Sequence, residues 1–274
     1  YMSKIIWSKG LINKDKYCLE HTSYISNKKE IENQINKSID KLWIRNNCLD
    51  LYFVNELLNK PLIIYISDGD ATFPYHYNKD YIHELLNNSF VLKIYAQNYN
   101  EEYLHPKLFH YPIGFDLHTT DWFIGNNSYN KIKYIIQNRD NNKLMRCLCD
   151  CHININNSSS RLELRDIKND FIDKLSDRVE IDTLINKYYS RYQFIISTHG
   201  NGLDCHRTYE ALLSGAIVIH KHSVLDTLFK QFPIVLIDDW NEINMINLNK
   251  WYKEYKPKTN IQNILKLLSY NNYE

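Results

Sequence analysis

Short apolar runs alternate with longer amphipathic segments along the first half of the chain. The runs KIIW, LDLYFV, LIIYIS, VLKIYA and LFHYPIGF have the length and residue types of buried strands. Segments 27–43 and 81–88 have the apolar spacing of helices. This order predicts an α/β fold with a parallel sheet, because each helix can return the chain to the next parallel strand.

The second half repeats the alternation more regularly. It predicts strands at LMRCLCDCHI, RVEI, FIIST, AIVIH and IVLID, and helices over 160–175, 183–190 and 205–214. Two further helical stretches, broken around Pro257, follow in 240–273. Such a series is typical of a doubly wound nucleotide-binding lobe.

Chain length and one polar stretch together indicate two lobes. The chain has 274 residues, which allows two compact domains of roughly 130 residues each. Segment 118–142 is rich in Asn and has no clear apolar period. We therefore predict a boundary near Asn130, between a first lobe over 1–130 and a second over 131–274.

Charge and composition favour a small-molecule partner. The 33 basic residues balance 32 acidic ones, so the basic surface expected of a nucleic-acid-binding protein is not predicted. Apolar runs are far shorter than the roughly 20 residues of a membrane-spanning helix. No secretory signal is visible in YMSKIIWSKG, and six cysteines are too few for a disulfide scaffold. We expect reduced thiols and a cytoplasmic protein without a membrane span.

Three of the cysteines alternate along one predicted strand. Cys147, Cys149 and Cys151 have the period of two that places side chains on a single strand face. This spacing favours buried strand cysteines. The alternative, a metal cluster with the adjacent His152, is the weaker interpretation.

The segment FIISTHGNGLDCHRTYEALLSGAIVIHKHS has the pattern of a phosphate-binding loop. An apolar strand ends at Thr198, and Gly200 and Gly202 would let the main chain approach a ligand closely. The following helix offers its amino end to a diphosphate, and Arg207 adds a forked cation. Glu210 lies one turn later on the same face, where it could accept hydrogen bonds from ribose hydroxyls. The alternative is an ordinary surface ion pair between Arg207 and Glu210.

This segment resembles the donor-site region of exostosin-like glycosyltransferases, in the run HGNGLDCHRTYEALLSGAIVI. Two upstream stretches, YAQNYNEEYLHPKLFHYPIGFDLHT and NNSSSRLELR, also resemble that family in the same order. The resemblance covers roughly residues 60 to 240. It implies the GT-B-type architecture, in which two Rossmann-like lobes face a central cleft.

The resemblance also implies an activity and a set of binding residues. Related enzymes move a sugar from a nucleotide donor, here expected to be a UDP-sugar, to a hydroxyl of a glycan acceptor, with inversion and without a metal or other cofactor. The first lobe would bind the acceptor and the second the donor. The expected donor-binding residues are Arg161, His199, Gly200, Asn201, Gly202, Arg207, Glu210, Lys221 and Ser223. For Lys221, exposure to solvent is the alternative.

An inverting transfer needs a general base for the acceptor hydroxyl. Asp68 and Asp70 directly follow the apolar run LIIYIS, so both are candidates at the end of a strand. Asp70 matches the family's acidic position better, and Asp68 remains open. Three alternatives stand beside this hypothesis: an Asp-Gly turn, a metal-dependent transferase using Asp68-Gly69-Asp70, and a nucleotide- or glycan-binding protein without catalysis.

Overall fold

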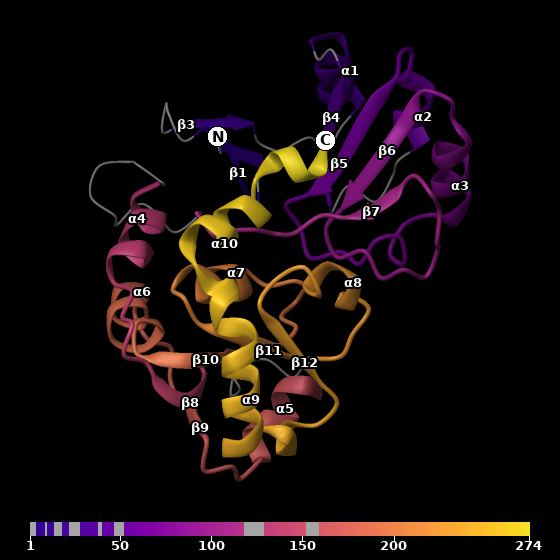
Figure 1. The fold of residues 1–274 in the computed structure, drawn as a ribbon. Helices are drawn as coiled ribbons and strands as arrows, with labels where there is room; N and C mark the ends of the chain where they lie inside the picture. Colours follow the sequence, from indigo (N-terminus) through magenta and orange to yellow (C-terminus); the bar gives the residue numbers. More distant parts are fainter. Residues whose placement is uncertain are drawn as a thin grey trace. The chain divides into compact units, whose positions relative to one another are not determined.

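The computed structural model describes residues 4–8, 10–13, 18–21, 28–37, 40–46, 52–117, 129–151 and 159–274. The chain divides into two compact units (Figure 1). Unit 1 comprises Tyr1–Gly114, Gly202–Asp204 and Ser269–Glu274, and unit 2 comprises Phe115–Asn201 and Cys205–Leu268. Asn130, where the sequence places the boundary, lies inside unit 2 because its helix packs against a later helix of that unit.

Unit 1 contains a four-stranded parallel sheet in the order β4–β5–β6–β7. Its strands are β4 (Lys41–Arg45), β5 (Leu62–Ser67), β6 (Val91–Ala96) and β7 (Leu108–His110). Its helices are α1 (Lys28–Lys37), α2 (Tyr52–Leu57), α3 (Lys79–Asn87) and the 3-10 turn η5 (Tyr270–Tyr273). A separate antiparallel sheet joins β1 (Lys4–Trp7), β2 (Gly10–Asn13) and β3 (Cys18–His21).

The two faces of the unit 1 parallel sheet bury different side chains, because successive strand residues point to opposite faces. One face carries aliphatic residues such as Ile64 and packs on α1 and α3. The other carries Trp43, Tyr65 and Tyr95, with the rings of Trp43 and Tyr65 stacked at 4.3 Å. Tyr270 joins this aromatic cluster and donates a hydrogen bond to the Tyr65 hydroxyl at 2.8 Å. The segment Ser269–Glu274 therefore completes the core of unit 1.

Unit 2 contains a five-stranded parallel sheet in the order β12–β11–β10–β8–β9. The strands are β8 (Leu144–Cys149), β9 (Ile172–Lys174), β10 (Tyr192–Ile196), β11 (Ile217–Lys221) and β12 (Ile234–Ile237). From β8 the chain continues to β9 at one edge of the sheet. It then returns to β10, on the other side of β8, and continues through β11 to β12 at the opposite edge. The direction of winding therefore reverses between β8 and β10.

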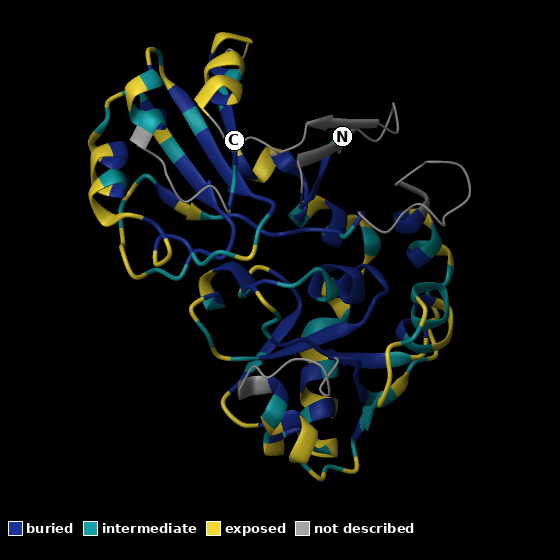
Figure 2. Ribbon diagram, turned by 180° about the vertical axis from the view of Figure 1, so that it is seen from behind, coloured by how far each residue is buried: buried dark blue, intermediate teal, exposed yellow. Residues whose placement is uncertain are grey.

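Helices cover both faces of this second sheet, and its central strands are buried (Figure 2). They are α4 (Tyr129–Gln137), α5 (Ser159–Asp166), α6 (Ile181–Thr183), the π-helical η2 (Leu184–Tyr189), α7 (His206–Leu213), α8 (Asp226–Phe229), η3 (Trp240–Glu242), α9 (Met245–Tyr255), η4 (Lys256–Thr259) and α10 (Ile261–Leu267). Cys147, Cys149 and Cys151 are buried in one core cluster with Phe194 and Trp251. This confirms that the three cysteines are buried, with Cys147 and Cys149 in β8 and Cys151 two residues beyond the end of that strand.

The structure confirms a mixed α/β fold with two parallel sheets and corrects several local predictions. The expected helix 27–43 ends at Lys37, and its last part is strand β4, where Leu42 pairs with Ile64 of β5. Helix α2 lies where LDLYFV predicted a strand, and α6 begins within RVEI. The expected helix 160–175 ends at Asp166 and is followed by β9.

These errors share one physical cause. A short apolar run has no period long enough to separate a helix from a strand, so the neighbouring element decides its conformation. In LFHYPIGF, only the first three residues form β7, because proline cannot donate a ladder hydrogen bond. Across the described residues, no helix is both long enough and apolar enough to cross a membrane.

Candidate functional site

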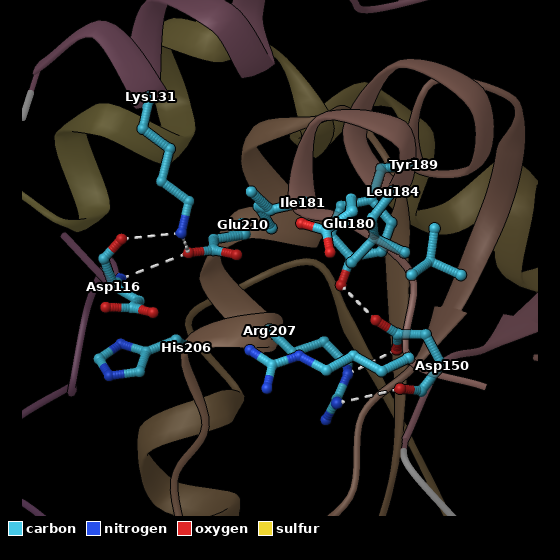
Figure 3. A pocket seen from close by; sticks show the side chains of 12 residues that line it. Asp116, Lys131, Asp150, Glu180, Ile181, Leu184, Tyr189, His206, Arg207 and Glu210 are labelled. Atoms are coloured by element: carbon cyan, nitrogen blue, oxygen red, sulfur yellow. Dashed lines mark hydrogen bonds and ion pairs between the residues drawn. The ribbon is translucent and has the colours of Figure 1, made fainter. Parts of the chain in front are cut away.

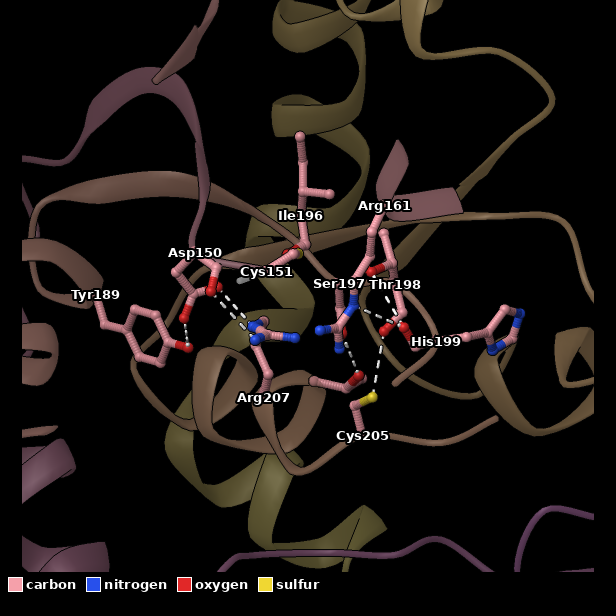
Figure 4. Close-up of polar contacts among 11 residues, drawn as sticks. Asp150, Cys151, Arg161, Tyr189, Ile196, Ser197, Thr198, His199, Cys205 and Arg207 are labelled. Atoms are coloured by element: carbon pink, nitrogen blue, oxygen red, sulfur yellow. Dashed lines mark hydrogen bonds and ion pairs between the residues drawn. The ribbon is translucent and has the colours of Figure 1, made fainter. Parts of the chain in front are cut away.

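The candidate residues of unit 2 gather at the carboxyl ends of β8 and β10. These strands are parallel neighbours, with Cys149 opposite Ile196. Asp150 directly follows β8, and residues 197–199 follow β10 (Figure 4). In open α/β sheets, a reversal of winding leaves a crevice at this edge, and ligands bind there. Sheet topology therefore points to the same loop as the glycine pattern in the sequence.

Arg207 on α7 points to Asp150 (Figure 4). Its Nε lies 2.5 Å from Oδ1 of Asp150, and its Nη2 donates to the Asp150 main-chain oxygen at 3.2 Å. The Tyr189 hydroxyl donates to Oδ2 of Asp150 at 2.8 Å. Burial opposes the charged form of Arg207, but Asp150, Cys151, Tyr189 and Cys205 together outweigh burial, so the pKa of Arg207 lies well above its usual value. Arg207 is therefore charged and forms an ion pair with Asp150.

Glu210 lies one turn beyond Arg207 and is held by a buried lysine (Figure 3). The ammonium group of Lys131 donates to Oε1 of Glu210 at 2.6 Å and to the main-chain oxygen of Asp116 at 2.8 Å. The main-chain N–H of Asp116 also donates to Oε1 of Glu210, at 3.3 Å. Oε2 of Glu210 has no hydrogen-bond partner among the described residues. The carboxylate is thus held through Oε1 alone.

Arg207 and Glu210 line one pocket of about 240 Å³ in unit 2 (Figure 3). Its walls come from five places in the sequence: Asp116, helix α4, the residue after β8, the segment from Arg178 into η2, and α7. The lining residues are Asp116, Lys131, Asp150, Arg178, Val179, Glu180, Ile181, Leu184, Tyr189, His206, Arg207 and Glu210. Four carboxylates and three fixed cations line the pocket, so it carries no excess of positive charge.

The His199–Gly200 segment is held by a different arginine. Nε of Arg161, on α5, donates to the main-chain oxygen of His199 at 3.0 Å. A methyl group at Gly200 would lie 3.3 Å from Nη2 of Arg161 and 3.2 Å from Sγ of Cys205. Arg161 is therefore in direct contact with the segment His199–Gly200, although it does not line the pocket.

His199 also contacts a buried histidine. The ring of His199 meets that of His220 edge to face, with centroids 5.0 Å apart. Burial, reinforced by His199, lowers the pKa of His220 to about 4, so His220 is neutral at physiological pH.

Four other residues expected to bind the sugar donor do not line this pocket. Lys221 donates to Oε2 of Glu163, on α5, at 2.8 Å rather than lying free in solvent. Oγ of Ser223 accepts from the Leu225 main-chain N–H at 3.2 Å in the turn before α8. Asn201 is exposed, and Gly202 belongs to unit 1. The structure therefore brings Arg207 and Glu210 into one pocket but not these four residues.

The two candidate carboxylates of unit 1 differ in their surroundings. β5 ends at Ser67, and Asp68 has a positive φ of 61°, so the strand does not continue through Asp68 and Asp70. Asp68 is buried, with Oδ2 lying 3.7 Å from Nε of Arg45. Asp70 is exposed. The two carboxylates do not share a strand face, and Asp70 is the more accessible one.

Several contributors to the pocket were not anticipated from the sequence. Asp150, like Asp68, directly follows an apolar strand. The rule that selected Asp68 from the sequence could therefore have selected Asp150 as well. Lys131 and Tyr189 carry no such signal, because only the fold brings them to Glu210 and Asp150. No group of three or more His, Cys, Asp or Glu residues in the described ranges is placed to hold a metal ion, and His152 lies outside those ranges.

Comparison with known proteins adds no family assignment. Neither protein-family models nor curated protein sequences match this chain.

Proposed function

We propose that this chain is an inverting glycosyltransferase that moves a sugar from a UDP-sugar to a hydroxyl of a glycan acceptor. The observation that carries the proposal is the pocket of unit 2, where Arg207 and Glu210 lie together at the winding reversal of a parallel sheet. Nucleotides bind at this position in doubly wound folds. The resemblance to exostosin-like enzymes in this same segment supports a nucleotide sugar as the ligand.

In this proposal the pocket holds the nucleoside. Its volume of about 240 Å³ lies below the roughly 300 Å³ at which pockets for drug-sized ligands begin, so it accommodates part of a nucleotide sugar. Oε2 of Glu210 accepts from ribose hydroxyls, while Lys131 holds Oε1. The balanced charges of the pocket suit a neutral nucleoside better than a diphosphate.

The diphosphate is assigned to the His199–Gly200 loop beside Arg161. Close approach is possible at Gly200, and the guanidinium of Arg161 lies next to it. In the transfer, the acceptor oxygen forms a bond to the anomeric carbon while the bond from that carbon to the diphosphate oxygen breaks. Arg161 stabilises the charge on the departing diphosphate.

Asp70 is the proposed base that takes the acceptor proton. Its carboxylate is exposed, whereas that of Asp68 is paired with Arg45. The pairing of Asp68 also weakens the metal-dependent alternative, in which both carboxylates would coordinate a cation. A nucleotide- or glycan-binding protein without catalysis would retain the pocket of unit 2 and need no base at Asp70.

The first test is binding of nucleoside diphosphates and their sugars, measured by thermal shift and calorimetry. UDP at 100 times its dissociation constant should stabilise the protein by about 2.7 kcal/mol. Glu210→Gln should weaken UDP binding by about 1 to 3 kcal/mol, since it removes a charged acceptor of hydrogen bonds. Glu254→Gln, which removes an exposed carboxylate of α9, is the matched control and should bind as wild type.

Release of UDP in the presence of a glycan acceptor separates the three hypotheses. Transfer that persists in EDTA supports the proposal, and loss that manganese restores supports the metal-dependent alternative. Binding without turnover supports the non-catalytic protein. Absence of any nucleotide effect, or equal effects of both glutamine variants, would contradict the assignment of the pocket.

A further inference from the structure

Asn98 contacts two loops that are far apart in the sequence. It follows β6, is 1% exposed, and has a positive φ of 55°. One loop is residues 68–71, which carry the two candidate carboxylates. The other is residues 202–204, which end the glycine loop, the segment 197–204 between β10 and α7. Residues 68–71, residues 202–204 and Asn98 all belong to unit 1.

The acceptor side of the Asn98 amide holds the glycine loop. Oδ1 of Asn98 accepts from the main-chain N–H of Asp204 at 2.9 Å. Oδ2 of Asp204 in turn accepts from the Ile113 main-chain N–H at 2.9 Å. Gly202 packs directly on the amide, since a methyl group there would lie 2.8 Å from Nδ2 of Asn98. Residues 202–204 are thus fixed in unit 1, while the chain on either side of them belongs to unit 2.

The donor side of the same amide holds the carboxylate loop. Nδ2 of Asn98 donates to the main-chain oxygen of Gly69 at 3.1 Å, between the two aspartates. Gln97 donates to the same oxygen at 2.8 Å and accepts from the Asp68 main-chain N–H at 3.1 Å. Asn46 adds a third donor to Gly69, at 3.1 Å. The Gln-Asn pair of the YAQNYN motif is therefore a structural clamp on this loop.

We propose that Asn98 is a positioning residue that couples the glycine loop to the loop of Asp68 and Asp70. An amide group is rigid and planar, so a displacement at Oδ1 or Nδ2 moves both ends together. Gly202 touches the nitrogen that holds Gly69, so a shift of the glycine loop changes the support of the carboxylate loop. Resting on the proposed function, this coupling lets residues 202–204, which continue the chain from the proposed diphosphate-binding segment His199–Gly200, influence the position of the candidate base.

The coupling can be tested without any ligand by amide hydrogen exchange. Gly202→Ala places its methyl group against Nδ2 of Asn98 and should speed exchange at Asp68 by at least about threefold. Gly200→Ala is the matched control, because its methyl group meets Arg161 and Cys205 instead. It should leave exchange at Asp68 unchanged. Equal effects of the two variants, or an effect of Gly202→Ala confined to its own loop, would overturn the proposal.

A second variant keeps the test independent of strain at Gly202. Asn98→Asp retains an acceptor for Asp204 and loses the donor to Gly69, so exchange should rise about threefold at Asp68 and stay near wild type at Asp204. Added UDP should slow amide exchange in both loops of the wild type. In the Asn98→Asp variant, it should slow exchange in the glycine loop alone. UDP that protects neither loop contradicts the proposed function, whereas protection of the glycine loop alone in wild type contradicts the coupling.

Discussion

Arg207 and Asp150 form an ion pair whose side chains are only 13% and 7% exposed. Such a pair adds little net stability, because removing two charges from water costs about as much as their attraction returns. Breaking it is costly, since the remaining charge stays buried. The Tyr189 hydroxyl donates to Oδ2 of Asp150, and burial together with Asp150 raises the pKa of Tyr189, so that the hydroxyl keeps its proton.

Asp150→Asn should lower the free energy of unfolding by about 3 to 5 kcal/mol, because it leaves the Arg207 guanidinium buried without a counter-ion. Tyr189→Phe should cost only about 1.5 kcal/mol, the loss of one hydrogen bond to a charged acceptor. The double variant Asp150→Asn, Arg207→Met is the control and should recover most of the loss. Urea denaturation followed by tryptophan fluorescence measures all three, and a similar cost for Asp150→Asn and Tyr189→Phe would contradict the charge argument.

At the scale of elements, basic side chains occupy the carbonyl ends of several helices in unit 2. Arg139 donates to the main-chain oxygens of Leu213, at the end of α7, and Thr259, at the end of η4. Lys143 donates to the main-chain oxygens of Tyr189 and Ser190, at the end of η2. N–H donors at these positions satisfy carbonyls that have no partner within the helix.

Lys143 should make stability depend on pH. Burial, with Lys256 and Arg139 nearby, lowers the pKa of Lys143 to about 7, whereas an unfolded lysine titrates near about 10.4. Between these values the unfolded chain binds a proton that the folded chain does not, so the free energy of unfolding rises with pH. The rise is at most about 1.4 kcal/mol per pH unit.

Urea denaturation of wild type and Lys143→Met between pH 7 and 9 measures this slope. The free energy of unfolding should rise more steeply with pH for the wild type than for Lys143→Met. Methionine binds no proton, and all other titrating groups are the same in the two proteins. Parallel curves would show that Lys143 keeps an ordinary pKa in the folded protein.

On the scale of the whole molecule, each unit carries one half of the proposed chemistry. Unit 2 holds the pocket with Arg207 and Glu210, and unit 1 holds Asp68 and Asp70. Binding and base catalysis should therefore separate when residues of one unit are changed.

Asp70→Asn should lower transfer by roughly 100-fold or more while leaving UDP-sugar affinity unchanged, because it deletes the base and keeps the shape. Asp68→Asn is the companion variant, and its effect should be smaller since Asp68 is already paired with Arg45. Steady-state kinetics with varied donor and acceptor measure both. If Asp68→Asn alone abolishes transfer, the base is Asp68, and if both variants are fully active, neither carboxylate is the base.

Parts of the fold and of the candidate site could be predicted because they depend on local sequence. Continuous apolar runs marked β5, β6, β8, β10 and β11, and helix α7 was found within one residue at each end. Arg207 and Glu210 share a helix face by periodicity alone. Short segments such as 41–45 were misassigned, because pairing with β5 decides their conformation.

The sequence by itself determined the α/β alternation, the glycine loop and the placement of Arg207 and Glu210 on one face of a helix, because these depend on residues within a few turns of one another. Only the tertiary structure decided that Asp150, Tyr189 and Lys131 meet that helix, and that Asn98 joins two loops of unit 1. The physical reason is strand order. Which loops become neighbours depends on how distant strands pair, and no local pattern of apolar and polar residues encodes that pairing.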